Sequence, residues 1–322
     1  MTATMRDVAQ LDAMLNAMAK NLSPCILKQM KKYGCEILDN AGQIYSFDAE
    51  EAKRDFIYKI ESKDKALDSN IKMSESIWQH IIDSNNIDLT NYLSIITSED
   101  IKKCRKTWNG HKSQFEPRLL CKMDSNKMRP KVLIDNNICI LSVKNGTYAL
   151  IKENIYIPLI KHNCVPKIIY NKNDSLILDM GNSETSMLDS LKYNNIFDDI
   201  IGEKIKYGPL LGGRHRCNFD TIVGSTCMEI RGSQYETDGC YETDNYICVV
   251  EAKSVDCTDF NVRQLYYPYR EVYNKAGGKK QIICLFIYKD KQNIIHIHKY
   301  EWMNYKKMLD IKNIGYYQYY YA

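Results

Sequence analysis

Apolar and polar residues follow a helical period in the first third of the chain. A first helix is predicted by apolar residues that recur every three or four positions: Val8, Leu11, Met14, Leu15 and Met18. Residues 24–110 continue this mostly helical pattern. They include one helix from Ile71 to Asn86 and a short helix that opens at Ser98.

The pattern changes after Pro130 to short runs rich in β-branched residues. Three such runs begin at Val132, Ile138 and Tyr148 and predict short strands. The Asn145-Gly146 pair between the last two runs is a strong signal for a two-residue hairpin turn. The sequence therefore predicts helices followed by a small β-meander.

The rest of the chain mixes strand and helix patterns. Polar residues at 171–174 and 182–184 bound the next domain, and we expect two domains, residues 1–165 and 166–322. The apolar run from Gln281 to Tyr288 predicts a strand.

Two segments near the end of the chain leave alternatives open. Ile and His alternate from Ile294 to His298, so both histidines share one face. We favour a surface strand there over a metal-binding pair, because no third ligand is near. The aromatic tail from Tyr316 to Tyr321 predicts a docked terminal strand or an interface, with stacking on bases as the alternative.

Composition excludes several classes of protein. Hydrophobic residues make up 44% of the chain and charged residues 26%, which is typical of a globular protein. The longest apolar run, Ile282 to Tyr288, is far shorter than the roughly 18 residues of a membrane-spanning helix. The first residues do not read as a signal peptide, so we expect a cytoplasmic protein without a membrane partner.

The 12 cysteines are expected to be reduced, because the chain is long and lacks a secretory signal. Five of them fall between Cys217 and Cys257, with His215 beside them. None stands in the close pairs that structural zinc sites use, so buried free thiols are favoured over a zinc site.

The net charge of +4 conceals two opposite regions. Ten Lys and Arg residues face two acids between Lys102 and Lys131, whereas eight acids face two bases between Glu229 and Phe260. The first region is suited to a polyanion and the second to cations. Helices, a β-meander and a basic run at their junction together resemble a winged-helix module. We therefore expect residues 1–165 to bind DNA, with phosphate contacts from Lys102, Lys103, Arg105, Lys106, Lys112 and Arg118.

The acidic region holds a constellation of catalytic type. Tyr246 to Lys253 is a predicted strand, in which Glu251 and Lys253 project from one face while Ala252 points into a core. A hairpin pairing Tyr235–Thr237 with this strand would bring Asp238 beside Glu251. Two adjacent carboxylates repel unless a divalent cation bridges them, and a neighbouring Lys then orients or activates a bound water. The arrangement predicts metal-dependent hydrolysis of phosphodiesters.

Asp238 with Glu251-Ala252-Lys253 resembles the PD-(D/E)xK nuclease motif, as found in type II restriction endonucleases. The resemblance covers about the last 150 residues, and Thr237 stands where the motif often has Pro. It implies an α+β or α/β core, a mixed β-sheet flanked by helices, and Mg²⁺ as cofactor. It also implies metal binding by Asp238 and Glu251, with the Ala252 carbonyl as a further ligand, and water activation by Lys253. Gln264 on the following predicted helix is similar to a glutamine that related nucleases place near the catalytic lysine.

Further candidates surround this motif in the sequence. Glu236 would share the face of Asp238 and act as an additional metal ligand or supporting acid, with an exposed acid as the alternative. Gln234 extends the same face, where it would orient water or contact DNA. Additional DNA contacts are expected from a glycine-rich basic turn and from the helix after the motif: Arg214, Arg216, Arg263 and Arg270.

The sequence thus predicts a Mg²⁺-dependent, sequence-specific endonuclease of the type II restriction class acting on double-stranded DNA. Cleavage of both strands implies two active sites and hence a homodimer, and a restriction role implies a companion DNA methyltransferase that is not physically bound. One alternative is a repair or recombination nuclease on the same core. The other is a non-enzymatic DNA-binding protein whose acidic cluster only balances its surface charge.

Overall fold

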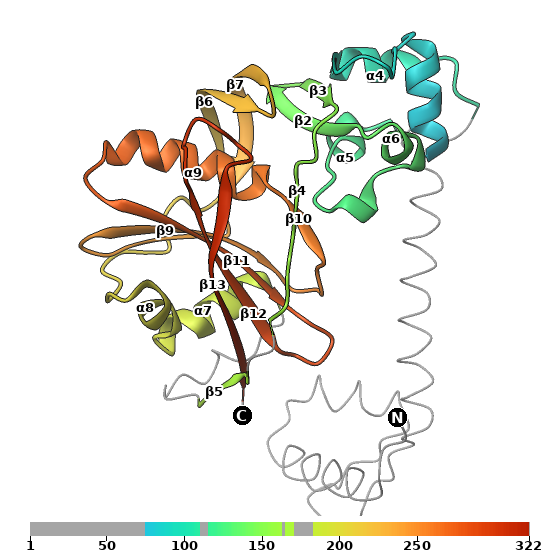
Figure 1. The fold of residues 1–322 in the computed structure, drawn as a ribbon. Helices are drawn as coiled ribbons and strands as arrows, with labels where there is room; N and C mark the ends of the chain where they lie inside the picture. The colour runs from blue at the N-terminus through green and yellow to red at the C-terminus, as the bar shows by residue number, and fades with distance from the viewer. Residues whose placement is uncertain (1–74, 110–114, 163–164, 171–182, 322) are drawn as a thin grey trace, which may run out of the picture. The chain divides into compact units, whose positions relative to one another are not determined.

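The computed structural model describes residues 75–109, 115–162, 165–170 and 183–321. All of these belong to one compact unit, residues 71–322, with a mixed α+β architecture (Figure 1). The predicted helix at Val8–Met18 lies outside the described residues. None of the described helices is long and apolar enough to cross a membrane.

The first described elements are mostly short. Residues 75–84 are helical, as predicted for Ile71–Asn86. They are followed by β1 (Leu93–Thr97), α4 (Ser98–Cys104), α5 (Pro117–Leu120), the 3-10 helix η2 (Asn126–Met128), α6 (Lys131–Asp135), β2 (Cys139–Lys144) and β3 (Thr147–Ile151). The helix predicted at Ser98 is confirmed: the side chain of Thr97 accepts from the Asp100 N–H, and the Asp100 carboxylate accepts from the Thr97 N–H. This capping box fixes the start of α4.

Two of the predictions for this region are wrong. Leu93–Thr97 is a strand rather than part of a helical stretch, because it pairs antiparallel with β3. The run after Pro130 is the helix α6 rather than a strand, and Asn137, two positions beyond its last residue, has a φ of 55°. Pro130 suits a helix start, and a single turn of β-branched residues is too short for its propensity to decide the structure. The hairpin at Asn145-Gly146 is confirmed between β2 and β3.

A five-stranded sheet has the order β1-β3-β2-β7-β6, with β6 spanning Arg214–Val223 and β7 spanning Thr226–Glu236. The strands β6 and β7 form a long antiparallel hairpin, and β2 runs parallel to β7. The sheet thus joins strands from both sides of the boundary predicted after residue 165. That boundary and the winged-helix character of the first region stay predictions.

A six-stranded mixed sheet contains most of the remaining strands, in the order β5-β13-β12-β11-β9-β8. Their bounds are β5 (Lys167–Ile169), β8 (Gly239–Glu242), β9 (Tyr246–Lys253), β11 (Gln281–Lys289), β12 (Ile295–Trp302) and β13 (Ile311–Tyr321). The strands β9 and β11 are parallel and are connected by helix α9 (Arg263–Ala276). A short two-stranded sheet pairs β4 (Tyr156–Pro158) with β10 (Asp259–Asn261).

Helices cover both faces of the six-stranded sheet. Alternate residues of β9, such as Cys248, Val250 and Ala252, pack in an apolar cluster with α7 (Glu184–Tyr193) and α8 (Ile196–Ile201). Side chains on the other face pack with α9 in the larger core (Figure 1). Alternation is the normal behaviour of a strand between two layers. A mixed sheet flanked by helices therefore agrees with the architecture expected for the C-terminal region.

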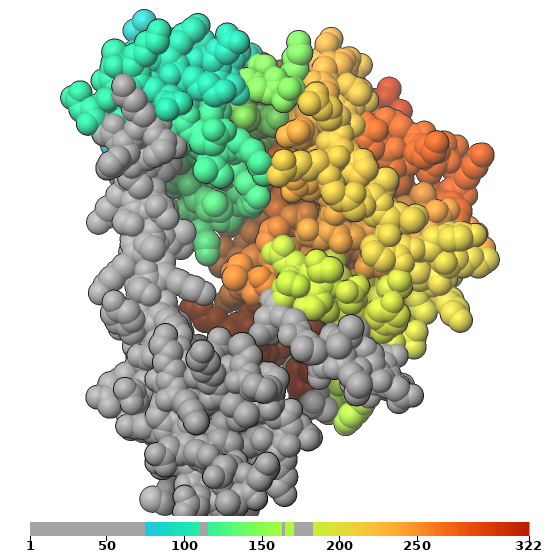
Figure 2. Space-filling view, turned by 180° about the vertical axis from the view of Figure 1, so that it is seen from behind, coloured from blue at the N-terminus to red at the C-terminus, as the bar shows by residue number. Residues whose placement is uncertain are grey.

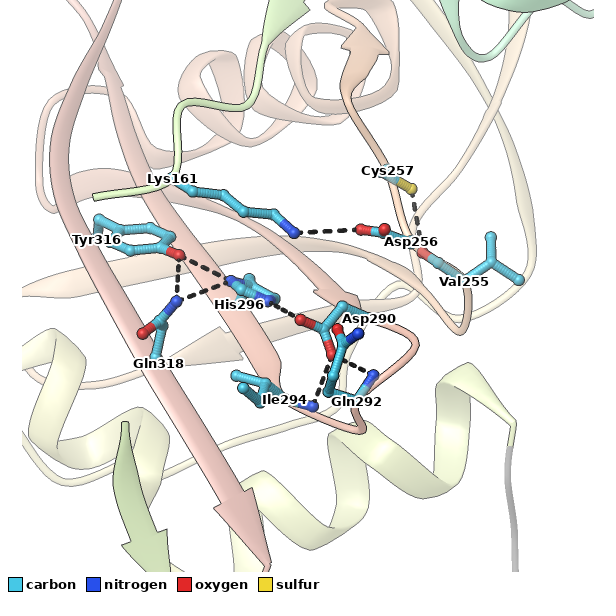
Figure 3. Close-up of polar contacts among 10 residues, drawn as sticks. All are labelled: Lys161, Val255, Asp256, Cys257, Asp290, Gln292, Ile294, His296, Tyr316 and Gln318. Atoms are coloured by element: carbon cyan, nitrogen blue, oxygen red, sulfur yellow. Dashed lines mark hydrogen bonds and ion pairs between the residues drawn. The ribbon is translucent and has the colours of Figure 1, made fainter. Parts of the chain in front are cut away.

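The histidines of β12 are buried, so the predicted surface strand is wrong. His296 is 1% exposed and His298 is fully buried. His296 Nε2 donates to Asp290 Oδ2 at 2.8 Å, and its Nδ1 lies 2.7 Å from the hydroxyl of Tyr316 (Figure 3). The tail is a docked terminal strand, as predicted, because β13 pairs with both β12 and β5.

Candidate functional site

The strand β9 and the turn before β8 bring three of the predicted residues together. Asp238 lies between β7 and β8, where its backbone N–H donates to the Val250 carbonyl at 3.2 Å. Its Oδ2 accepts a hydrogen bond of 2.7 Å from the backbone N–H of Ala252. The carboxylate of Asp238 therefore lies against β9 between Glu251 and Lys253. The predicted proximity of Asp238 and Glu251 is confirmed, although the strand that pairs with β9 is Gly239–Glu242 rather than Tyr235–Thr237.

Glu251 and Lys253 share one face of β9, as the two-residue spacing predicts. The ammonium of Lys253 donates to Glu251 Oε1. Ala252 points to the opposite face, where it is fully buried in the apolar cluster. In an extended strand the N–H and C=O of one residue point to the same side. The Ala252 carbonyl is therefore on the Asp238 side of β9.

Gln264 joins this group from the first turn of α9. Its Nε2 donates to Glu251 Oε1 at 2.6 Å, so this carboxylate oxygen accepts from both Gln264 and Lys253. The Gln264 Oε1 atom is buried and has no hydrogen-bond partner among the described residues. A buried acceptor without a partner costs free energy, which suggests that a further group completes this site.

Burial and nearby charges shift the pKa values of Glu251 and Lys253. Glu251 is 7% exposed, and desolvation raises its pKa to about 7, although the adjacent Lys253 ammonium opposes the shift. Burial alone would lower the pKa of Lys253, but the Glu251 and Asp238 carboxylates outweigh it and raise this pKa above its usual value. The site therefore changes charge near neutral pH through Glu251, while Lys253 stays an ammonium.

These residues line a pocket of about 250 Å³, which we call the catalytic pocket because it holds the residues that the sequence predicts to be catalytic. Its wall also includes cationic side chains at its rim, namely Arg118, Lys122, Arg214 and Arg263. Gln234 and Glu236 line it from β7, and Glu236 forms an ion pair of 2.6 Å with Arg214. Glu236 is therefore part of the pocket wall, paired with a cation at the rim.

Sequence reasoning missed two acids of this pocket, Glu184 and Asp124. Glu184 opens α7, and its Oε1 accepts from the Ser254 N–H at 3.4 Å, next to Lys253. Asp124 stands in the basic run and forms an ion pair with Lys122. Neither acid has a spacing that relates it to Asp238 in the sequence, because only the fold brings these segments together.

The remaining predicted DNA contacts have different surroundings. Lys102 lines a second pocket, next to the first, whereas Lys103 on the same helix forms an ion pair with Asp100. Three further predicted DNA contacts line neither pocket: Arg105, Lys106 and Arg216. Lys112 is not among the described residues.

The prediction that Arg270 contacts DNA is wrong, because this residue is only 4% exposed. Its Nη1 donates to the Asp220 carbonyl and to the Tyr266 hydroxyl, and its guanidinium lies 4.7 Å from the ring centroid of Phe219. The amphipathic helix α9 turns this position toward the core, so Arg270 is a buried structural residue rather than a DNA contact.

The cysteines Cys217, Cys240 and Cys248 are buried, and burial raises the pKa of each thiol. Within the described part of the chain, no group of three or more His, Cys, Asp or Glu side chains is arranged to hold a metal ion.

Comparison with known families divides the chain near the β2–β3 turn. One family model, described as Domain of unknown function (DUF6997), matches residues 146–320, more than half of the chain. The chain belongs to this family. A second model, Domain of unknown function (DUF6996), matches residues 75–150. No curated protein and no solved structure matches the chain. Asp238, Glu251, Lys253 and Gln264 lie in the DUF6997 segment, whereas Arg118 and Lys122 lie in the DUF6996 segment, so both segments line the catalytic pocket.

Proposed function

We propose that the protein is a Mg²⁺-dependent endonuclease that hydrolyses phosphodiester bonds in double-stranded DNA. The observation that supports this best is the convergence of Asp238, Glu251 and Lys253 in one pocket with a cationic rim. Carboxylates at the base attract a divalent cation, while Arg118, Arg214 and Arg263 attract the phosphates of a nucleic acid. A cluster that only stabilises the fold would not need carboxylates and arginines together in one pocket.

The donor set of the pocket fits a hard divalent cation. Asp238 and Glu251 supply carboxylate oxygens, and the Ala252 carbonyl lies on the same side of β9. The unpartnered Oε1 of Gln264 adds a buried oxygen beside Glu251. These are the residues that would hold Mg²⁺, and when bound the ion lowers the pKa of water and stabilises negative charge on a phosphate.

The protein residues have separate tasks in this proposal. Glu251 has a pKa of about 7 and so must lose its proton near neutral pH before it acts as an anionic ligand. Lys253 is an ammonium and would orient the attacking water and the phosphate by donating hydrogen bonds. Gln264 fixes the orientation of Glu251 through their hydrogen bond. Glu184, beside Lys253, is placed to compete for its ammonium during the reaction.

Sequence-specific cleavage of both strands, a homodimer and a companion methyltransferase are further parts of this proposal. They distinguish a type II restriction enzyme from a repair or recombination nuclease on the same core. Discrete fragments from a long duplex would favour restriction, whereas cutting only at ends, branches or lesions would favour repair.

The test is an incubation of the purified full chain with long duplex DNA and Mg²⁺, followed by sequencing of the ends. We expect cleavage by the wild type, its loss in Lys253→Ala and Asp238→Asn, and normal cleavage in Lys275→Ala, which removes an exposed cation at the end of α9. Absence of cleavage with any divalent metal, or equal cleavage by Lys253→Ala, would overturn the proposal.

A further inference from the structure

A second hollow of about 190 Å³ adjoins the catalytic pocket on the side of the DUF6996 segment. It shares Arg118, Ser142, Tyr148 and Gln234 with the catalytic pocket. It also includes Lys102 on α4 and Asn145 in the β2–β3 turn. The two hollows are therefore neighbours that share part of their walls. In the space-filling view the blue-green residues of α4 to α6 lie against the yellow-orange residues of β6 and β7 (Figure 2). We call the second hollow the distal groove.

Five exposed polar side chains of the distal groove are not used by the fold. They make no side-chain hydrogen bond or ion pair with any residue of the described ranges: Lys102, Glu116, Arg118, Asn145 and Gln234. Lys103, one residue away, pairs instead with Asp100 at 3.6 Å. The groove thus presents two cations, one acid and two amides, and the hydrogen-bonding capacity of the amides is available to a ligand.

The backbone of both amides is held rigidly. The turn at Asn145 is fixed because the Gly146 carbonyl accepts from the Ser98 N–H at 2.7 Å. Gly146 has a φ of 70°, and a Cβ there would lie 3.1 Å from the Ser98 hydroxyl. Gln234 follows Ser233, whose hydroxyl lies 2.8 Å from that of Ser142 on the neighbouring strand β2. Side chains on such fixed backbone are suited to specific recognition.

We infer that the distal groove reads base edges of the DNA beside the scissile phosphate, with Asn145 and Gln234 as the adenine-reading residues. A carboxamide donates to adenine N7 and accepts from adenine N6, which makes Asn and Gln the natural partners of this base. Lys102 and Arg118 bind the flanking phosphates, because cations attract the backbone of any sequence equally. The inference rests on the proposed function for its substrate. It predicts A·T pairs in the recognition site next to the cut.

The test measures binding separately from cleavage. Duplexes bound by the Lys253→Ala full chain are selected from a randomised library, and the affinity for the selected duplex and for a scrambled one is then measured for second-site variants. Asn145→Ala and Gln234→Ala should each lower the affinity for the selected duplex about 5- to 150-fold, the range of one good bidentate base contact. Neither should change the affinity for the scrambled duplex. Arg118→Ala should lower the affinity for both duplexes equally and reduce the slope of log K against log salt by about one.

Matched controls use side chains of the same kind outside the groove. Gln292→Ala removes an exposed amide from the β11–β12 turn, and Lys275→Ala removes an exposed cation from α9; neither should alter the preference between the two duplexes. A selected consensus without A·T pairs would overturn the inference. An unchanged preference in both amide variants would do the same.

The two proposals can fail separately. If the wild type cuts DNA but Asn145→Ala and Gln234→Ala keep its site preference, the reading role fails and the nuclease stands. If these variants lose the preference while no chain cuts DNA, the groove binds as inferred and the nuclease proposal fails.

Discussion

The amide of Gln264 and the carboxylate of Glu251 are joined by a hydrogen bond of 2.6 Å from Nε2 to Oε1. The bond links the first turn of α9 to the strand β9 across 13 positions of sequence. It stabilises the ionised form of a carboxyl group whose pKa is already raised to about 7 by burial. Loss of this bond would therefore raise the pH at which Glu251 becomes an anion.

We expect Gln264→Leu to raise the pKa of Glu251 further, by about one unit or more. The reason is that a hydrogen bond to a charged group contributes about 1.5–3 kcal/mol, and one pKa unit corresponds to 1.36 kcal/mol. The acid limb of the pH–activity profile should move to higher pH by the same amount, and carboxyl NMR should show the titration directly. Gln292→Leu is the matched control. An unmoved titration of Glu251 would contradict the role assigned to Gln264.

The raised pKa of Glu251 also predicts a pH-dependent cost in stability. The pKa is about 7 in the folded chain against an ordinary 4.5, so the folded state binds the proton more tightly. Burial of Glu251 does not lower the free energy of unfolding below about pH 4.5, where the group is protonated in both states. The loss of stability grows as the pH rises toward 7 and reaches its full value above pH 7. At 1.36 kcal/mol per pKa unit, the cost is about 3 kcal/mol.

Glu251→Gln removes this ionisation. Measured by urea unfolding from pH 4.5 to 7.5, the wild type should lose about 3 kcal/mol relative to the variant. Asp244→Asn, which alters an exposed acid paired with Lys206, should show no such trend. A difference that does not depend on pH would rule out the raised pKa.

The buried pair of Asp290 and His296 is expected to stabilise the sheet. Burial would raise the pKa of Asp290, but donors from His296, Ile294 and Gln292 outweigh it and hold this pKa below 3.8 (Figure 3). This stabilisation is present above pH 3.8 and is lost as the pH falls further. Asp290→Asn should cost about 1–3 kcal/mol at pH 7 and flatten the loss of stability in acid.

The exposed pair of Lys131 and Asp135 supplies the control. Asp135→Asn should cost less than about 1 kcal/mol, because both side chains are more than half exposed. Equal effects of the two substitutions in chemical denaturation would show that the Asp290 network is not a stabilising element.

Arg263 and Arg270, which lie two turns apart on α9, should affect different properties: Arg263 DNA binding and Arg270 stability. Arg270 is buried among aromatic rings, so Arg270→Met should lower the free energy of unfolding by at least about 2 kcal/mol. Arg263 lines the catalytic pocket, so Arg263→Met should weaken DNA binding and its salt dependence while changing stability by less than about 1 kcal/mol. Denaturation and DNA titrations at two salt concentrations check both. The opposite pattern would restore Arg270 as the DNA contact.

The local part of the site follows from the sequence. The apolar run ending at Lys253 identifies β9, and strand alternation places Glu251 and Lys253 on one face with Ala252 opposite. The short separation of Asp238 from β9 favours a hairpin, because nearby segments pair at little entropic cost. Capping and turn residues at Thr97 and Gly146 likewise fix α4 and the β2–β3 turn.

Only the tertiary structure decided which distant residues complete the site and which polar residues are buried. Glu184, Arg118 and Gln234 reach the catalytic pocket because separate elements pack around β9 and β7, and no sequence spacing encodes that packing. His296 shows the same limit: alternation of Ile and His fits a strand with one exposed face, yet both histidines of β12 are buried in the fold. Local propensity and periodicity act over a few residues, whereas burial and the pairing of remote side chains depend on which faces meet.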